Sequence, residues 1–157
     1  MQEHEKFMRV AIGLSEDNVQ QGIGGPFGAV IVKDGNIVAC SANKVVQQID
    51  PTAHAEISAI RLACKQLGTH NLQGCVIYTS CEPCPMCLGA IYWAQLDAIY
   101  YGNTKADAAA IGFNDHFIYD EISQPVNQRK LQMTRVLGIE ALQAFKLWEA
   151  SVSKTGY

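Results

Sequence analysis

The chain has 157 residues, a length that fits one domain of about 100–200 residues with its own core. Charged residues make up 17% of it, against about 25% in an average soluble domain, while 48% of its residues are hydrophobic, which predicts an oligomer with apolar interfaces. The formal net charge of -3 and the pI near 5.7 argue against a protein that grips nucleic-acid phosphates.

Cysteine usage and the start of the chain predict a cytoplasmic protein. Residues 1–6 lack the basic start and apolar run of a secretory signal. The sequence also lacks an apolar stretch of about 18 residues, so we expect no membrane-spanning segment. Six cysteines are then expected to be mostly reduced, and Cys81, Cys84 and Cys87 have a spacing typical of metal binding. No linker or repeat interrupts the sequence, so we expect residues 1–157 to form a single domain.

The first half of the chain predicts a helix, a hairpin and a second helix. Residues 3–21 carry apolar side chains at helical spacing and end at Gly22, before a glycine-rich loop. Residues 27–32 and 37–39 flank an Asp-Gly turn and predict a β-hairpin. Asp50 is a candidate N-cap for a helix that starts near His54 and ends at Gly68.

Strands and helices alternate after this point. Residues 75–79 and 98–101 have the composition of buried strands, and residues 85–95 between them are helical. This order predicts an α/β architecture in which part of the sheet is parallel. Further on, we expect helices at residues 105–110 and 139–151 and a last strand at residues 131–137.

Two helix starts supply the residue types of one metal site. His54 and Glu56 open one helix, and Cys84 and Cys87 open the next, directly after a strand. Because Cys84 and Cys87 are three residues apart, one helical turn puts both sulfurs on one face, where a histidine completes a three-ligand zinc site. The fourth zinc position is then open to water, which the metal activates near neutral pH. Glu56 is free as a proton shuttle if His54 lies in an irregular first turn.

Three other interpretations of these residues stay open at this point. Cys81 has the same spacing to Cys84, so His54 with all three cysteines would form a closed site that supports no catalysis. An iron–sulfur cluster is disfavoured because Ile91 stands where the ferredoxin pattern needs a fourth cysteine. A structural zinc module that only binds partners would leave Glu56 as an ordinary carboxylate at a helix start.

The site motifs resemble those of a known family. His54-Ala55-Glu56 together with Pro83-Cys84-Pro85-Met86-Cys87 is similar to the signature of the zinc-dependent cytidine deaminase-like superfamily. Within it, the chain resembles the bacterial guanine deaminases through residues 24–30, 50–56, 78–87 and 112–115. The resemblance implies a three-layer α/β/α fold with a central mixed sheet of about five strands.

The same resemblance implies roles for individual residues. One zinc ion per subunit would be held by His54, Cys84 and Cys87. Glu56 would be the catalytic acid and base, and Asp115 would recognise the amino edge of the base and assist proton movement. The other substrate-binding residues would be Phe27, Asn43, Ala55, Trp93, Phe113 and Tyr157.

The implied reaction is the hydrolysis of guanine to xanthine and ammonia, in which activated water attacks C2 of the ring. A tRNA-specific adenosine deaminase would carry a nearly identical motif, but the acidic pI and the few basic residues after Ile139 argue against binding an anticodon loop. Cytosine or another free base ranks third as substrate. The resemblance further implies a homodimer with exchanged C-terminal segments, in which Tyr157 covers the pocket of the partner.

Overall fold

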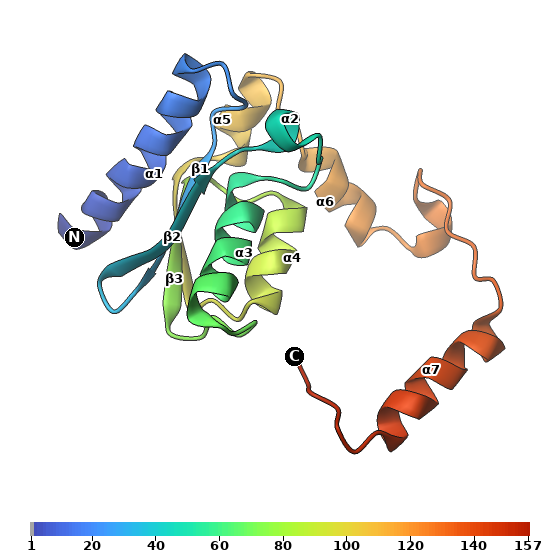
Figure 1. The fold of residues 1–157 in the computed structure, drawn as a ribbon. Helices are drawn as coiled ribbons and strands as arrows, with labels where there is room; N and C mark the ends of the chain where they lie inside the picture. The colour runs from blue at the N-terminus through green and yellow to red at the C-terminus, as the bar shows by residue number, and fades with distance from the viewer. Residues whose placement is uncertain (1) are drawn as a thin grey trace. The chain divides into compact units, whose positions relative to one another are not determined.

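The computed structural model describes residues 2–157, which divide into two units that we describe separately (Figure 1). The first unit ends at His116 and contains α1 (Gln2–Gln20), β1 (Gly28–Lys33), β2 (Asn36–Ala42), α2 (Val45–Gln48), α3 (Ala55–Leu67), β3 (Cys75–Cys81), α4 (Pro85–Trp93), β4 (Ala98–Asn103) and α5 (Lys105–Ala110). The second unit runs from Phe117 to Tyr157 and contains most of α6 (His116–Ser123), a short 3-10 helix (Val126–Gln128) and α7 (Gly138–Ala150). None of the helices in residues 2–157 is long and apolar enough to cross a membrane.

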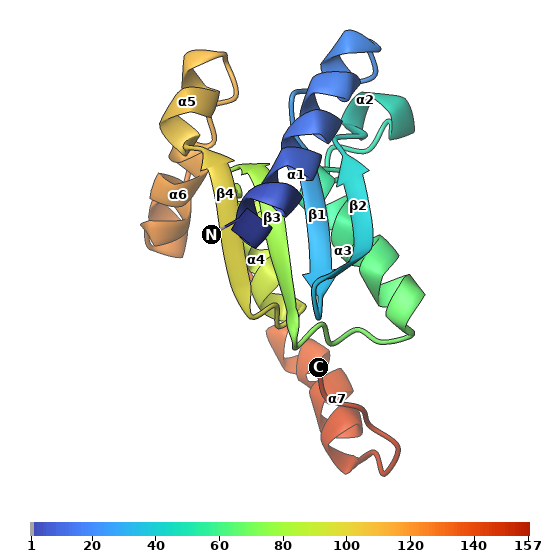
Figure 2. The ribbon, with the colours of Figure 1, turned by 90° about the vertical axis from the view of Figure 1, so that its left-hand side faces the viewer.

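The four strands of the first unit form one mixed sheet in the order β2-β1-β3-β4. Strand β1 pairs antiparallel with β2 and β3, while β3 and β4 run parallel and are joined by the crossover helix α4. Helix α1 covers one face of the sheet, and α3 and α4 cover the other (Figure 2). The predicted three-layer α/β/α fold is therefore confirmed, with four strands in place of about five.

Each face of the sheet has its own apolar core. On one side, Ala55, Ala59 and Ala63 of α3 pack with Ile77 of β3. Small side chains on this face of α3 allow the helix to lie close to the strands. Tyr78 of β3 points to the other side, where it packs against Phe7 and Ala11 of α1. Side chains along β3 alternate between the two faces of the sheet, so only every second residue of β3 faces α3.

The expectation of a last strand at residues 131–137 was wrong. These residues form no strand, and Leu131 and Val136 are 78% and 73% exposed. Residues 117–157 contain no strand, so an extended segment there finds no neighbouring strand with which to pair its backbone groups. Helix α2 was not predicted either, because four residues are too few to show a helical period.

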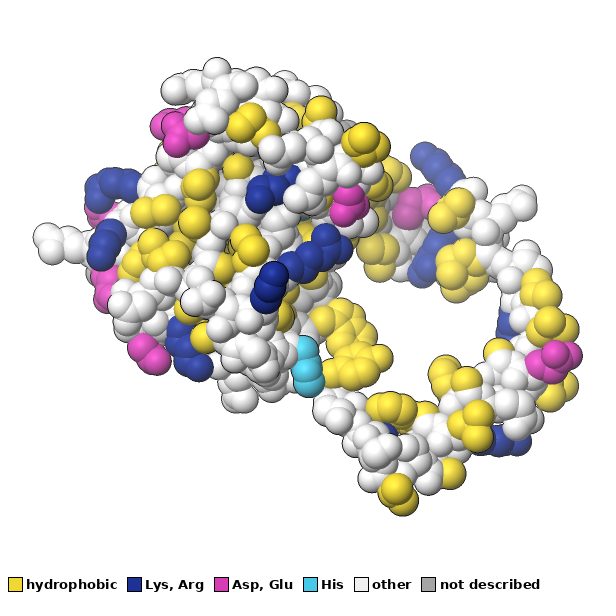
Figure 3. All heavy atoms as spheres, viewed as in Figure 1, with side chains coloured by type: hydrophobic (Ala, Val, Ile, Leu, Met, Phe, Trp, Pro, Cys, Tyr) yellow, Lys and Arg dark blue, Asp and Glu magenta, His cyan; other side chains and the backbone are white. Residues whose placement is uncertain are grey.

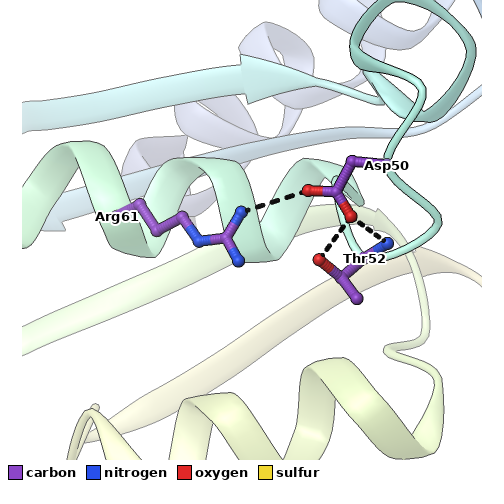
Figure 4. A network of polar contacts seen from close by, with 3 residues as sticks. All are labelled: Asp50, Thr52 and Arg61. Carbon is purple, nitrogen blue, oxygen red and sulfur yellow. Dashed lines mark hydrogen bonds and ion pairs between the residues drawn. The ribbon is translucent and has the colours of Figure 1, made fainter.

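Asp50 does not cap α3, contrary to expectation (Figure 4). Its Oδ1 accepts hydrogen bonds from the backbone N and the Oγ1 of Thr52 at 2.8 and 2.7 Å, and its Oδ2 lies 3.6 Å from Nη1 of Arg61 on α3. The bonds from Thr52 hold the pKa of Asp50 below its usual value. His54 is the N-cap instead, with φ -63° and ψ 160°. The Asp50 turn and its ion pair thus fix the loop that leads to His54.

Gly28, the first residue of β1, allows α1 to lie directly on the strand. A Cβ atom at this position would collide with the carbonyl oxygen of Ala11 and meet Leu14 Cβ at 2.9 Å and Ser15 N at 3.0 Å. We expect Gly28→Ala to lower the free energy of unfolding in urea by about 3 kcal/mol, the upper part of the usual range for overpacking. Gly13→Ala in α1 is the matched control, because a Cβ there meets nothing within 4 Å. Equal stability of the two variants would contradict the contact.

Candidate active site

Two helix N-termini present the three candidate metal ligands. His54 is the N-cap of α3, Cys84 is the N-cap of α4, and Cys87 lies in the first turn of α4. Pro85 occupies the first position of α4, where its fixed φ suits a helix start and its missing N–H costs no hydrogen bond. The sulfur of Cys84 accepts a hydrogen bond from the backbone N–H of Cys87 at 3.5 Å, so capping of the helix also draws the two cysteines together.

The spacing of these three side chains fits a tetrahedral zinc ion. Nδ1 of His54 lies 3.6 Å from Sγ of Cys84 and 3.5 Å from Sγ of Cys87, and the three ligand atoms lie within 4.8 Å of one another. Zinc bonds of about 2.3 Å to sulfur and about 2.0 Å to nitrogen, at tetrahedral angles, put nitrogen and sulfur about 3.5 Å apart. One nitrogen and two sulfurs are also the donor types that zinc prefers. The residues present therefore fit a zinc ion with three protein ligands.

Protonation differs sharply among the three ligands. A hydrogen bond from Cys87, assisted by His54, lowers the pKa of the Cys84 thiol to about 4, although burial opposes the shift. The hydrogen bond to Cys84 raises the pKa of His54, and the Cys84 contact together with burial raises the pKa of Cys87. Cys84 is thus the most acidic thiol of the group, and the positive ends of two helices favour its negative charge.

Glu56 lies beside the ligands and is 6% exposed. Its Oε2 accepts a hydrogen bond from Sγ of Cys87 at 3.4 Å, and its Oε1 accepts one from Oγ1 of Thr79 at 3.3 Å. Burial raises the pKa of Glu56 above its usual value. Burial thus makes this carboxyl group hold a proton more readily than an exposed glutamate does, which suits a group that moves protons.

Several residues predicted to bind substrate lie in the first unit with contacts to one another or to the ligands. Phe27 and Phe113 make an edge-to-face pair with ring centroids 4.9 Å apart. Asn43 is buried, its backbone N–H bonds to the carbonyl of Phe27 at 2.9 Å, and its Oδ1 accepts from Val45 N at 3.2 Å. Ala55, the fully buried first residue of α3, follows His54 directly.

Asp115 lies within electrostatic reach of the ligands. Burial raises the pKa of its carboxyl, and the negative charge on Cys84 adds to that shift. Asp115 in turn contributes to the raised pKa of His54. The loop before α6 therefore brings a second carboxyl toward the metal ligands.

The positions of Trp93 and Tyr157 do not test their predicted role in base binding. Trp93 is the last residue of α4, six positions after Cys87 and thus about 9 Å further along the helix, and it is 68% exposed. Tyr157 belongs to the second unit. Their roles in base binding stay predictions.

Two buried polar residues near the site, Asn18 and Thr79, are not among the residues predicted from the sequence. Asn18, near the end of α1, is buried, and its Nδ2 donates to the carbonyl oxygens of Gly25 at 2.8 Å and Asn43 at 3.0 Å. An asparagine just before a glycine-rich loop is a signal that could have been noticed. Thr79 contacts Glu56 from β3, and its signal is a hydroxyl at an inward position of a buried strand.

Cys81 lies outside the group of ligands. Its thiol donates to the carbonyl oxygen of Thr104 at a distance of 3.6 Å, and burial raises its pKa to about 11. Within residues 2–157, the group of histidine, cysteine and acidic side chains able to hold a metal comprises His54, Cys84 and Cys87. We expect Cys81→Ala to retain about one zinc per chain in metal analysis, as a three-ligand site requires. Cys84→Ala, the matched control, should lose the metal, and loss in both variants would restore the closed four-ligand site.

Comparison with known proteins identifies a family for the first part of the chain. Residues 1–103 match the family described as the cytidine and deoxycytidylate deaminase zinc-binding region. This segment includes all three candidate ligands and Glu56.

Individual relatives cover different shares of the chain. Guanine deaminase of Bacillus subtilis is 52% identical over 154 residues, which are 98% of this chain and 99% of that protein. The X-ray structure of guanine deaminase from the same organism superposes with a TM-score of 0.95 over 98% of both chains. The tRNA-specific adenosine deaminase of Agrobacterium fabrum is 44% identical over 86 residues, 55% of this chain and 57% of that protein.

Proposed function

Since the chain belongs to the cytidine and deoxycytidylate deaminase family, we propose that it hydrolyses guanine to xanthine and ammonia. The observation that carries this function is its 52% identity to guanine deaminase of Bacillus subtilis over 98% of the chain. That similarity continues past the zinc-binding region of residues 1–103, through Phe113 and Asp115 and into the C-terminal segment. It therefore includes residues proposed to contact the base as well as the metal ligands.

The catalytic residues of this proposal are the ligands and two carboxyl groups. His54, Cys84 and Cys87 would hold one zinc ion, which supplies the Lewis acidity that makes water a usable nucleophile near neutral pH. Glu56 takes the proton of that water on Oε2, the oxygen nearer Cys87, and passes it to the purine. Asp115 assists proton movement at the amino edge of the base.

The base would be held by apolar and polar groups from several loops. Phe27 and Phe113 form an apolar wall, as their edge-to-face contact supports. Asn43 would bind the edge of the purine through its amide, whose orientation is fixed by the hydrogen bond from Val45 N to Oδ1. Ala55 would contact the base from the start of α3, and Trp93 and Tyr157 would complete the pocket.

A tRNA substrate has less support. The tRNA-specific adenosine deaminase of Agrobacterium fabrum matches 55% of the chain, compared with 98% for guanine deaminase of Bacillus subtilis. The net charge of -3 also provides little attraction for the phosphates of an anticodon stem. A free base is therefore the favoured class of substrate.

Ammonia release from four substrates tests the proposed function. The full chain, loaded with zinc, is assayed with guanine, adenine, cytosine and a tRNA anticodon stem. We expect release from guanine to exceed release from the other three by about a hundredfold or more, the discrimination available to a site with polar groups matched to one base. Faster release from the anticodon stem or from cytosine would overturn the choice of guanine.

The second unit supports a homodimer with exchanged C-terminal segments. Apolar side chains recur along its surface, and α7 has no buried residue (Figure 3). Leu142, Phe145 and Trp148 of α7 are all exposed. Such a helix gains stability when a partner covers its apolar side chains. We propose that the partner is a second copy of this chain, whose pocket is then closed by Tyr157.

Two further properties belong to this proposal. The two units would together make up a single deaminase domain, as the match to guanine deaminase over 98% of the chain supports. A cytoplasmic location is supported by the cysteines, all six of which are free thiols. Thiols used as metal ligands are best kept in a reducing compartment.

A further inference from the structure

Thr79 contacts one oxygen of the Glu56 carboxyl group, and the candidate ligand Cys87 contacts the other. Thr79 lies in β3, is 1% exposed, and places its Oγ1 3.3 Å from Oε1 of Glu56. Side chains along a strand alternate between its faces, and Ile77, two residues earlier, packs in the core under α3. Thr79 therefore shares the face of β3 that meets the start of α3.

The two carboxylate oxygens of Glu56 have different neighbours. Oε2 is the oxygen near Sγ of Cys87, whereas Oε1 is the oxygen near the hydroxyl of Thr79. A glutamate side chain has three rotatable bonds, so a group that fixes one oxygen also decides where the other points. Only an oxygen that faces the ligands is in place to exchange a proton with water or substrate there.

The hydroxyl of Thr79 has a second acceptor. Its Oγ1 lies 3.0 Å from the backbone carbonyl oxygen of Cys81, at the end of the same strand. A threonine hydroxyl carries one hydrogen, which the two acceptors must share. The bond to Cys81 could serve only to shape the end of β3, so a test must separate that role from an action on Glu56.

We propose that Thr79 is a positioning residue of the deaminase reaction, holding Oε1 of Glu56 so that Oε2 faces the metal ligands and carries the proton. The inference rests on the proposed function, because it assigns Glu56 the role of acid and base. Thr79 itself exchanges no proton with the substrate.

Thr79→Val removes the hydroxyl and keeps the shape of the side chain. With guanine as substrate, we expect kcat to fall about tenfold, the scale of a buried hydrogen bond to a charged group, while KM and zinc content stay unchanged. Thr79→Ser restores a hydroxyl and should retain kcat within about twofold of the wild type. Unchanged kcat in Thr79→Val, or equal losses in the valine and serine variants, would overturn the inference.

A double-mutant cycle with Glu56→Ala separates the two acceptors of the hydroxyl. If Thr79 acts through Glu56, Thr79→Val should cause no further loss of kcat in the Glu56→Ala background, and the two substitutions should also be non-additive in unfolding of the zinc-loaded protein. Additive effects in both measurements would assign the hydroxyl to Cys81 alone and overturn the inference. Thr79→Ala repeats the cycle should the valine variant fail to fold. A wild-type protein without activity on guanine would instead overturn the proposed function, and the inference with it.

Discussion

Glu56→Gln should keep the fold and the zinc and lose about a hundredfold or more of kcat on guanine. The amide can still accept the hydrogen bond from Thr79 and has nearly the same volume, so the packing at the start of α3 is preserved. What it cannot do is take a proton, and general acid–base catalysis contributes about two to four orders of magnitude. Steady-state kinetics and metal analysis of the same preparation give both readouts.

Glu16→Gln is the control for that substitution, because it removes the same charge from an exposed position on α1. It should retain the kcat of the wild type. Turnover by Glu56→Gln within a few-fold of the control would show that another group moves the proton, and Asp115 would be the first to consider.

Deletion of Gly156 and Tyr157 should lower kcat/KM on guanine by about a hundredfold, the loss expected when a group that positions the substrate is removed. The zinc content should not change, because the metal ligands lie in α3 and α4. A tail that merely frays could be removed at little cost. Sizing of the truncated protein is the necessary control, since the comparison holds only at the same oligomeric state.

Mixed dimers decide which subunit the tail serves. Subunits that lack Tyr157 but keep Glu56 are reassembled with subunits that carry Glu56→Gln and a complete tail. In an exchanged dimer, the tail of the second kind closes the intact site of the first, so activity should return. No recovery after verified mixing would place the tail over its own subunit, contrary to the exchange.

Local patterns were sufficient to predict most of the first unit. The hairpin follows from two apolar runs around Asp34-Gly35, and α3 ends at Leu67, before the C-cap Gly68, whose φ of 66° suits a residue without a side chain. Asp50 was misread because an aspartate can cap a helix or close a turn with equal ease, and only the contacts of Thr52 and Arg61 decide between them. The expectation for residues 131–137 was wrong because apolar residues that partly alternate with polar ones form a strand only beside a neighbouring strand.

The site residues likewise fall into those that local sequence motifs predict and one that a contact between distant segments identifies. His54, Glu56, Cys84 and Cys87 stand in two short motifs at helix starts, where spacing along the sequence already implies a shared face. Thr79 reaches Glu56 from a position 23 residues away, because α3 packs on the sheet that contains β3. The inward hydroxyl marks Thr79 as unusual in a buried strand, but no local period identifies Glu56 as its partner.

The two ends of α1 differ in how close they lie to the proposed pocket, and this difference decides where an affinity tag or surface tether is best joined. Both N–H groups of the Asn18 side chain are committed to the loops that carry Gly25 and Asn43, so the end of the helix is coupled to the proposed pocket. Gln2, sixteen residues earlier, is about 24 Å away along the helix axis. An affinity tag or surface tether joined before α1 would therefore pull on the end that bears no site residue. The same attachment after Tyr157 would burden the segment proposed to close a pocket.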